Sequence, residues 1–91
     1  MVAKLYAILV YDVNKKRVAK ALKICRRYLT WVQNSVFEGE ISEAKLRELQ
    51  LHLKNIMKDQ EDSVLIYRFR DQRYFEKEVM GQEKNPVDSF L

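Results

Sequence analysis

One carboxylate stands where a long apolar run ends, and it is the residue best placed for chemistry. The run covers residues 4–12, Lys-Leu-Tyr-Ala-Ile-Leu-Val-Tyr-Asp, and the acid is Asp12. A carboxylate at the end of a strand can bind a hard divalent cation or take part in proton transfer. Strand-end acids also cap helices or pair with nearby cations, so the residue type alone leaves both roles open.

Basic residues follow Asp12 in a block. No acid occurs in residues 13–37, whereas acids outnumber bases from residue 38 onward, so the net charge of +4 belongs to the first third of the chain. The basic side chains of the block are Lys15, Lys16, Arg17, Lys20, Lys23, Arg26 and Arg27. Such a block predicts a nucleic-acid or other polyanion partner. The alternative is a solvated helix face.

The apolar run itself predicts a buried strand over residues 4–12, bounded by Asn14 as a turn signal. Successive side chains alternate between the two faces of a strand. One face then carries Leu5, Ala7, Leu9 and Tyr11, and the other carries Tyr6, Ile8, Val10 and Asp12. Because both faces are apolar, a sheet built on this strand needs cover on both sides.

After this strand, Asn14 can cap a helix that runs to about Leu29. Its apolar stripe comprises Val18, Ala21, Leu22, Cys25, Tyr28 and Leu29. The first turn is basic, although cations are disfavoured at the positive end of a helix dipole. We therefore expect a negative group beside it, either Asp12 or a bound phosphate. Cys25 lies on the buried stripe and is expected to be a core residue rather than a nucleophile.

The rest of the chain predicts a hairpin, a second helix and further strands. In order these are strands at 30–33 and 36–41 with a turn at Asn34-Ser35, a helix capped by Ser42, a strand at 63–69 and a last strand at 74–80. The second helix carries an apolar stripe that leaves His52, the only histidine, on its surface.

Composition limits the class of protein. The chain has 91 residues, 47% apolar and 33% charged, with two Gly and one Pro, which is typical of one globular domain. We assign the domain to residues 1–81 and a C-terminal tail to 82–91. A single cysteine excludes an intrachain disulfide and a cysteine-cluster zinc site. The N-terminus lacks the features of a signal peptide, so a cytoplasmic protein without membrane contact is expected.

The order of these elements predicts an α+β fold, the ferredoxin-like βαββαβ plait with an extra C-terminal strand. Two helices cover one face of such a sheet, which leaves the face of Ile8, Val10 and Asp12 to a partner. A homodimer about a two-fold axis is the commonest solution, and it brings both Asp12 residues near the interface. Paired carboxylates repel unless a proton or a hard cation lies between them.

Several motifs together resemble a known family. They are Tyr11-Asp12-Val13, Lys16-Arg17-Val18, the run Val-Gln-Asn-Ser-Val-Phe-Glu-Gly at 32–39, and Asp62-Ser63-Val64. In this order and at these spacings they resemble the small CRISPR-associated spacer-acquisition proteins, the Cas two family, over nearly the whole chain. Many members have a basic residue before the Val-Gln pair. Trp31 stands there in this chain, where its ring can stack on a base or simply pack.

The resemblance implies a homodimer in which the extra strand extends the partner's sheet. It also implies that Asp12 binds a divalent metal at the dimer cleft, usually Mg²⁺, with Mn²⁺ as a substitute. Members are described as metal-dependent endonucleases acting on single-stranded RNA or duplex DNA. They are also described as the central dimer that bridges two dimers of the CRISPR integrase, in a heterohexameric adaptation complex.

Site residues follow from the same resemblance. It implies that Tyr11, Arg17, Ser35 and Phe37 line the region of Asp12. Arg17 is expected to be catalytic with Asp12, by stabilising negative charge that develops on a phosphodiester. The predicted nucleic-acid contacts are Tyr11, Lys15, Lys16, Arg17, Lys20, Lys23, Arg27, Ser35 and Phe37.

Two other functions remain open at this point. One is a non-catalytic scaffold that binds duplex DNA along the basic helix and docks the integrase through its C-terminal tail, where Phe90-Leu91 form an apolar pair. It is favoured by a thin catalytic inventory of one carboxylate per chain without a positioned histidine. The other is a ferredoxin-like RNA-binding module or RNase toxin unrelated to CRISPR.

Overall fold

The computed structural model describes residues 3–85 of the chain. Its elements are β1 (Lys4–Asp12), α1 (Lys15–Arg26), β2 (Thr30–Gln33), β3 (Val36–Ser42), α2 (Glu43–Ile56), β4 (Ser63–Phe69) and the short 3-10 helix η1 (Gln72–Tyr74). The predicted βαββαβ order and the ferredoxin-like α+β fold are confirmed. No helix among the described residues is both long and apolar enough to span a bilayer.

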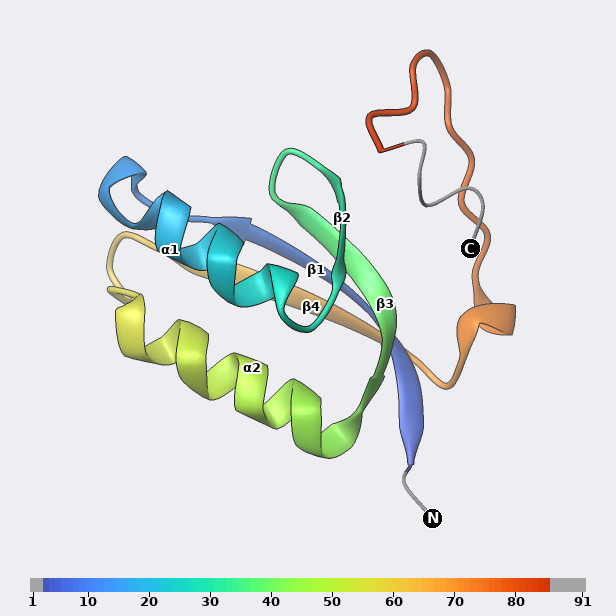
Figure 1. Ribbon diagram of the computed structural model, residues 1–91, viewed down its shortest axis with the longest axis horizontal. Coiled ribbons are helices and arrows are strands. Elements are labelled where there is room, and N and C mark those ends of the chain that lie inside the picture. The colour runs from blue at the N-terminus through green and yellow to red at the C-terminus, as the bar shows by residue number, and fades with distance from the viewer. Residues whose placement is uncertain (1–2, 86–91) are drawn as a thin grey trace.

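The strand β1 lies at the centre of the molecule. The sheet has the order β2-β3-β1-β4, and all three of its strand pairs are antiparallel. Val10 is opposite Val36 on one side and Leu65 on the other, and Asp12 is opposite Ser63. Both helices cover the same face of the sheet, in front of it in Figure 1. The other face has no α-helix among the described residues.

The core fills the space between the sheet and the two helices. As predicted, one face of β1 is buried there, with Ala7 and Leu9 fully inaccessible. Both helices and the neighbouring strand β3 contribute to this core. Its largest fully buried side chains are Phe37, Leu9, Leu46, Leu49 and Cys25. The predicted helix caps are confirmed, since Asn14 accepts a hydrogen bond from the Lys16 amide and Ser42 accepts one from the Lys45 amide.

Helix α1 is shorter than expected, and its buried face differs from the predicted apolar stripe. It ends at Arg26 rather than Leu29, because the amides of Arg27 and Tyr28 donate to the carbonyls three residues back and tighten the last turn. Ile24 lies in the core, whereas Val18, predicted on the buried stripe, is 42% exposed. The tight turn leads directly into β2.

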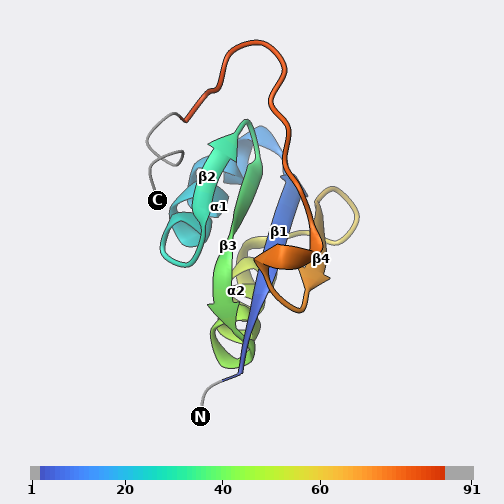
Figure 2. The same cartoon turned by 90° about the vertical axis from the view of Figure 1, so that its right-hand side faces the viewer.

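The face of the sheet away from the helices is partly covered by the chain itself. The Phe75 ring lies 4.9 Å from Tyr6 and 5.1 Å from Phe69, measured between centroids. Lys77 then reaches Glu38, with 2.5 Å between Nζ and the carboxylate. Figure 2 shows the segment after η1 rising past the sheet and arching over the β2–β3 hairpin. The sequence prediction that this face is left wholly to a partner is therefore wrong at its Tyr6 end.

The predicted strand at residues 74–80 is also wrong for the single chain. Residues 72–74 form η1, which Asp71 caps through the Arg73 amide, and residues 75–80 pair with no strand among the described residues. Docking of Phe75 on Tyr6 draws the chain across the sheet instead of along an edge. The Phe90-Leu91 pair, with the end of the predicted tail, lies outside the described residues.

Two leucines of α2 provide a test of the core. Leu49 is fully buried and Leu51 is 59% exposed. Leu49→Ala is expected to lower the free energy of unfolding by about 2–5 kcal/mol, because it removes apolar contact and leaves a cavity. Leu51→Ala in the same helix should change it by less than about 0.5 kcal/mol. Urea unfolding of both variants measures the difference, and equal effects would contradict the packing described.

Candidate functional site at the end of β1

Asp12 is the last residue of β1 and projects from the face away from the helices. Its side chain follows Val10 on this face and lies across from Ser63 of β4. Asp12 is exposed, and its carboxylate makes no hydrogen bond or ion pair within residues 3–85. A solvated carboxylate without a protein partner is available to a cation or to a second molecule.

A single chain supplies one oxygen ligand from this position. No group of three His, Cys, Asp or Glu side chains within residues 3–85 could hold a metal ion. The donor type fits Mg²⁺, which binds through one or two carboxylates and keeps several waters. In a two-fold dimer that joined two β1 ends, the Asp12 of the second copy would supply another carboxylate.

Asp62, the acid directly before β4, uses its carboxylate for hydrogen bonds within the protein. Asp62 has a fully buried side chain and accepts four hydrogen bonds. Its Oδ1 accepts from the Asn14 amide at 2.9 Å and from Arg17 Nη2 at 3.0 Å, and its Oδ2 accepts from Arg17 Nε at 2.6 Å and from the Lys58 amide at 2.9 Å. A carboxylate has about four acceptor sites, so Asp62 has none left for a metal.

This network also sets the charge state of Asp62. The hydrogen bonds from Arg17 hold the pKa of the Asp62 carboxyl far below its usual range, and those from the Asn14 and Lys58 amides act in the same direction. The interaction is charge-assisted and bidentate, which is the strongest kind of side-chain hydrogen bonding in proteins. Asp62 is therefore ionised wherever the protein is folded near neutral pH.

The negative group that the described residues place beside the first turn of α1 is thus not Asp12. It is Asp62, with Glu61 adding an exposed ion pair to Arg17 at 3.1 Å. Both acids lie in the turn between α2 and β4. The available signal was their place before a strand that pairs antiparallel with β1, which puts Asp62 across from the start of the basic block.

Arg17 has a different environment from the one predicted for a catalytic arginine. Its side chain is 12% exposed, and its Nε and Nη2 donate to Asp62 and Glu61. To donate those groups to a phosphate, Arg17 would have to leave a buried carboxylate unpaired, which is costly. Its expected role as a direct nucleic-acid contact is at odds with this pairing.

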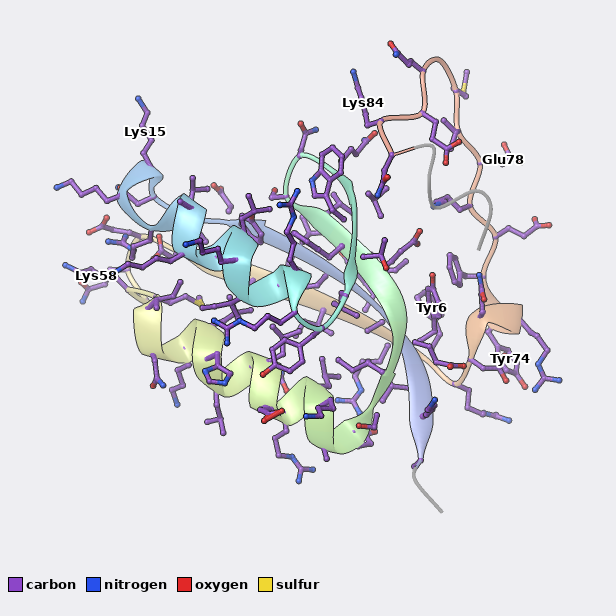
Figure 3. All side chains as sticks on the ribbon, viewed as in Figure 1. Tyr6, Lys15, Lys58, Tyr74, Glu78 and Lys84 are labelled. Carbon is purple, nitrogen blue, oxygen red and sulfur yellow. The ribbon has the colours of Figure 1, made fainter. Side chains whose placement is uncertain are left out.

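The remaining cations of the basic block are exposed on α1 and just after it. They are Lys15, Lys16, Lys20, Lys23, Arg26 and Arg27, and none makes an ion pair within residues 3–85. Figure 3 shows Lys15 projecting from the end of the molecule at which α1 begins, and Lys58 projecting from the same end. These side chains form an unneutralised basic surface, which we call the α1 basic surface.

Two predicted contact residues belong to the core instead. Phe37 is fully buried and Tyr11 is 5% exposed, with their ring centroids 6.1 Å apart. Burial raises the pKa of Tyr11, and Cys25 nearby acts in the same direction. Neither ring is accessible to nucleic acid in this conformation, so the two predicted contacts are corrected to packing. Ser35 is half-buried, and its carbonyl accepts from the Tyr11 amide at 3.1 Å.

Three other residues are settled by their surroundings. The Trp31 ring packs against the core and its Nε1 donates to the Asn34 carbonyl at 2.9 Å, so it acts in packing. Cys25 is fully buried, which confirms it as a core residue, and this burial raises the pKa of its thiol to about 12. His52 is half-buried beside Tyr28, at 6.2 Å between ring centroids, rather than fully on the surface.

The fold and this site define a class of small ferredoxin-like proteins with an exposed acid at the end of the central strand and a basic first helix. The profile of the family described as CRISPR associated protein Cas2 matches residues 5–77. The chain belongs to this family, as the sequence resemblance indicated.

Individual relatives agree. The chain is 54% identical over 84 residues to a CRISPR-associated endoribonuclease Cas2 of Archaeoglobus fulgidus, covering 92% of this chain and 91% of the relative. It is 51% identical over 87 residues to that of Thermotoga maritima, covering 96% and 99%. Among solved structures, a crystal structure of Cas2 superposes with a TM-score of 0.84 at 51% identity, covering 92% of this chain and 94% of that one.

The Asp62 network predicts how stability responds to acid. Because the folded-state pKa of Asp62 is depressed, its contribution is present above the ordinary aspartate pKa of about 4 and is lost as the pH falls toward the folded-state value. Asp62→Asn should therefore unfold at lower urea concentration than the unmodified protein at pH 7, and the gap should narrow below about pH 4. A gap that stays constant down to pH 2.5 would contradict this.

Proposed function

We propose that the chain is a metal-dependent endonuclease that acts as a homodimer. The observation that carries the proposal is Asp12, an exposed carboxylate at the end of the central strand that has no protein partner within residues 3–85 and that precedes Lys15, the first cation of the α1 basic surface, by three positions. The relatives named endoribonucleases support RNA as the substrate, and the substrate that we propose is single-stranded RNA. Duplex DNA is the alternative substrate and would use the same basic surface.

The uncovered part of the sheet supports the homodimer. Leu65 and Tyr67 are each 53% exposed there, beside the half-buried Ile8 and Val10. Exposed apolar side chains gathered on one face typically mark an interaction surface. A second copy packed on this face about a two-fold axis would cover them and bring the two β1 ends toward each other.

In that dimer Asp12 of each chain would hold Mg²⁺, with Mn²⁺ as a substitute. A bound ion of this type supplies a Lewis acid that polarises a phosphodiester oxygen and lowers the pKa of a bound water. The chain's own contribution is to hold the two carboxylates at the rim of an apolar interface. It also binds the polymer through the cations Lys15, Lys16, Lys20, Lys23 and Arg27, with the half-buried Ser35 at the same end of the sheet.

Replacing Asp12 tests the enzyme directly. Asp12→Ala is expected to lower Mg²⁺-dependent cleavage of a labelled single-stranded RNA by at least about 100-fold, because the site loses its protein ligand from both chains. Light scattering should show the same oligomeric state as before, since the substitution removes no apolar contact. Ser63→Ala, at the neighbouring position of β4, serves as the structural control.

If the Asp12→Ala variant still cleaves RNA, the Asp12 carboxylate is not required for the reaction. If such a variant still supports spacer acquisition in cells, the function moves to the second candidate, a non-catalytic scaffold. That candidate is favoured by the absence of a group of three metal-ligating side chains within residues 3–85. It would bind duplex DNA along the α1 basic surface and bridge two dimers of the integrase, docking them through residues 82–91.

The basic surface is tested by the salt dependence of binding. Lys20→Gln with Lys23→Gln should weaken RNA binding and reduce the slope of log affinity against log salt by about 1.4, since each single-strand phosphate contact contributes about 0.7. Lys54→Gln, an exposed lysine on α2, is the control and should leave the slope unchanged. Filter binding from 50 to 300 mM salt, about the range in which such effects appear, measures both. An unchanged slope in the double variant would place the polymer elsewhere.

A further inference from the structure

The Asp62 network holds together the two pieces of backbone that flank Asp12. On one side, the Asn14 amide, two residues after Asp12, donates to Asp62 at 2.9 Å. On the other side, Asp62 directly precedes Ser63, which is the cross-strand partner of Asp12. The buried carboxylate of Asp62 thus connects the end of β1 to the start of β4.

Two further sets of hydrogen bonds reinforce this connection. The Lys58 amide donates to Asp62, and the amides of Glu61 and Asp62 donate to the Lys58 carbonyl, so the turn before β4 is closed on itself. Arg17 donates to both carboxylate oxygens from the first turn of α1, which fixes the helix against that turn. Between Asp12 and Asn14 stands only Val13, which packs against the core.

We propose that Asp62 and Arg17 are positioning residues, which act together to hold the backbone of Asp12 where its carboxylate can serve the reaction. The inference rests on the proposed function, since it assigns the pair a role toward the same Asp12. Arg17 acts through Asp62 and not on the substrate, because its Nε and Nη2 are engaged by acids and its side chain is nearly buried. Supporting groups of this kind typically contribute about 10- to 100-fold to metal affinity or activity.

The two roles for Arg17 lead to different kinetics. An arginine that contacts the phosphate adds its own contribution whatever stands at position 62. An arginine that acts through Asp62 contributes nothing once that carboxylate is gone. A double-mutant cycle over Arg17→Gln and Asp62→Asn separates the two.

The experiment measures cleavage of a labelled single-stranded RNA, the Mg²⁺ concentration at half-maximal rate, and the affinity for Mn²⁺ by electron paramagnetic resonance. Circular dichroism fixes a temperature at which every variant is folded. Each single variant is expected to lower kcat and to raise the Mg²⁺ half-saturation about 10-fold or more, with KM within about twofold. The double variant should match Asp62→Asn within about twofold. Glu48→Gln, which removes a surface carboxylate paired with Lys45, is the matched control and should change nothing.

The Mg²⁺ concentration at half-maximal rate is the decisive measurement. A variant that merely loses folded protein has a lower rate, but its Mg²⁺ concentration at half-maximal rate is unchanged. Effects of Arg17→Gln and Asp62→Asn that multiply in the double variant would overturn the proposal, as would a raised KM for Arg17→Gln alone. If the unmodified protein binds Mn²⁺ but cleaves no RNA, the proposed function fails and the cycle is judged on Mn²⁺ affinity. Equal, non-additive losses of affinity would support the positioning role. Unchanged affinity, or an unmodified protein that binds no Mn²⁺, would overturn it.

Discussion

The structure depends on one constraint, which is that the central strand β1 is apolar on both faces while two helices can cover only one. The helix side is satisfied within the chain, where Ala7 and Leu9 are completely buried. The other side is satisfied in part by Phe75 at Tyr6 and is left open at Leu65 and Tyr67. Burial of that remaining surface is the driving force available to a second copy, and it is worth roughly 25 cal/mol per Å² of apolar area removed from water.

The same fold separates the cations of α1 into one that is paired with acids and others that are exposed to solvent. The acids that neutralise the start of α1 come from the turn before β4, more than forty residues away in sequence, and Arg17 is the one cation of α1 with which they form ion pairs among the described residues. The other cations of α1 stay unpaired among residues 3–85 and face solvent. One arginine is therefore structural and its basic neighbours remain available for a polyanion, although all belong to one run of residues.

The site has few free acidic groups among the described residues, and the fold accounts for this. Within the described residues Asp62 and Glu38 are buried acids with cationic partners, whereas Asp12 keeps a free carboxylate. The backbone of Asp12 is held by pairing with Ser63 of β4, whereas the pairing of β1 with β3 ends at Val10, and the Asp12 side chain is solvated. Symmetry then offers the simplest way to a second ligand, since a two-fold axis near one strand end duplicates it.

The sequence by itself determined the order of the elements, both helix caps, the buried face of β1 and the family, because these rest on local periodicity, capping chemistry and motif spacing. It also placed Asp12 at a strand end. Only the tertiary structure decided which acid meets Arg17, that Tyr11 and Phe37 are core rather than contact residues, and that residues 74–80 turn across the sheet instead of forming a strand. Each of those outcomes depends on pairing between distant segments, and periodicity along the chain does not specify which distant side chains come within hydrogen-bonding or packing distance.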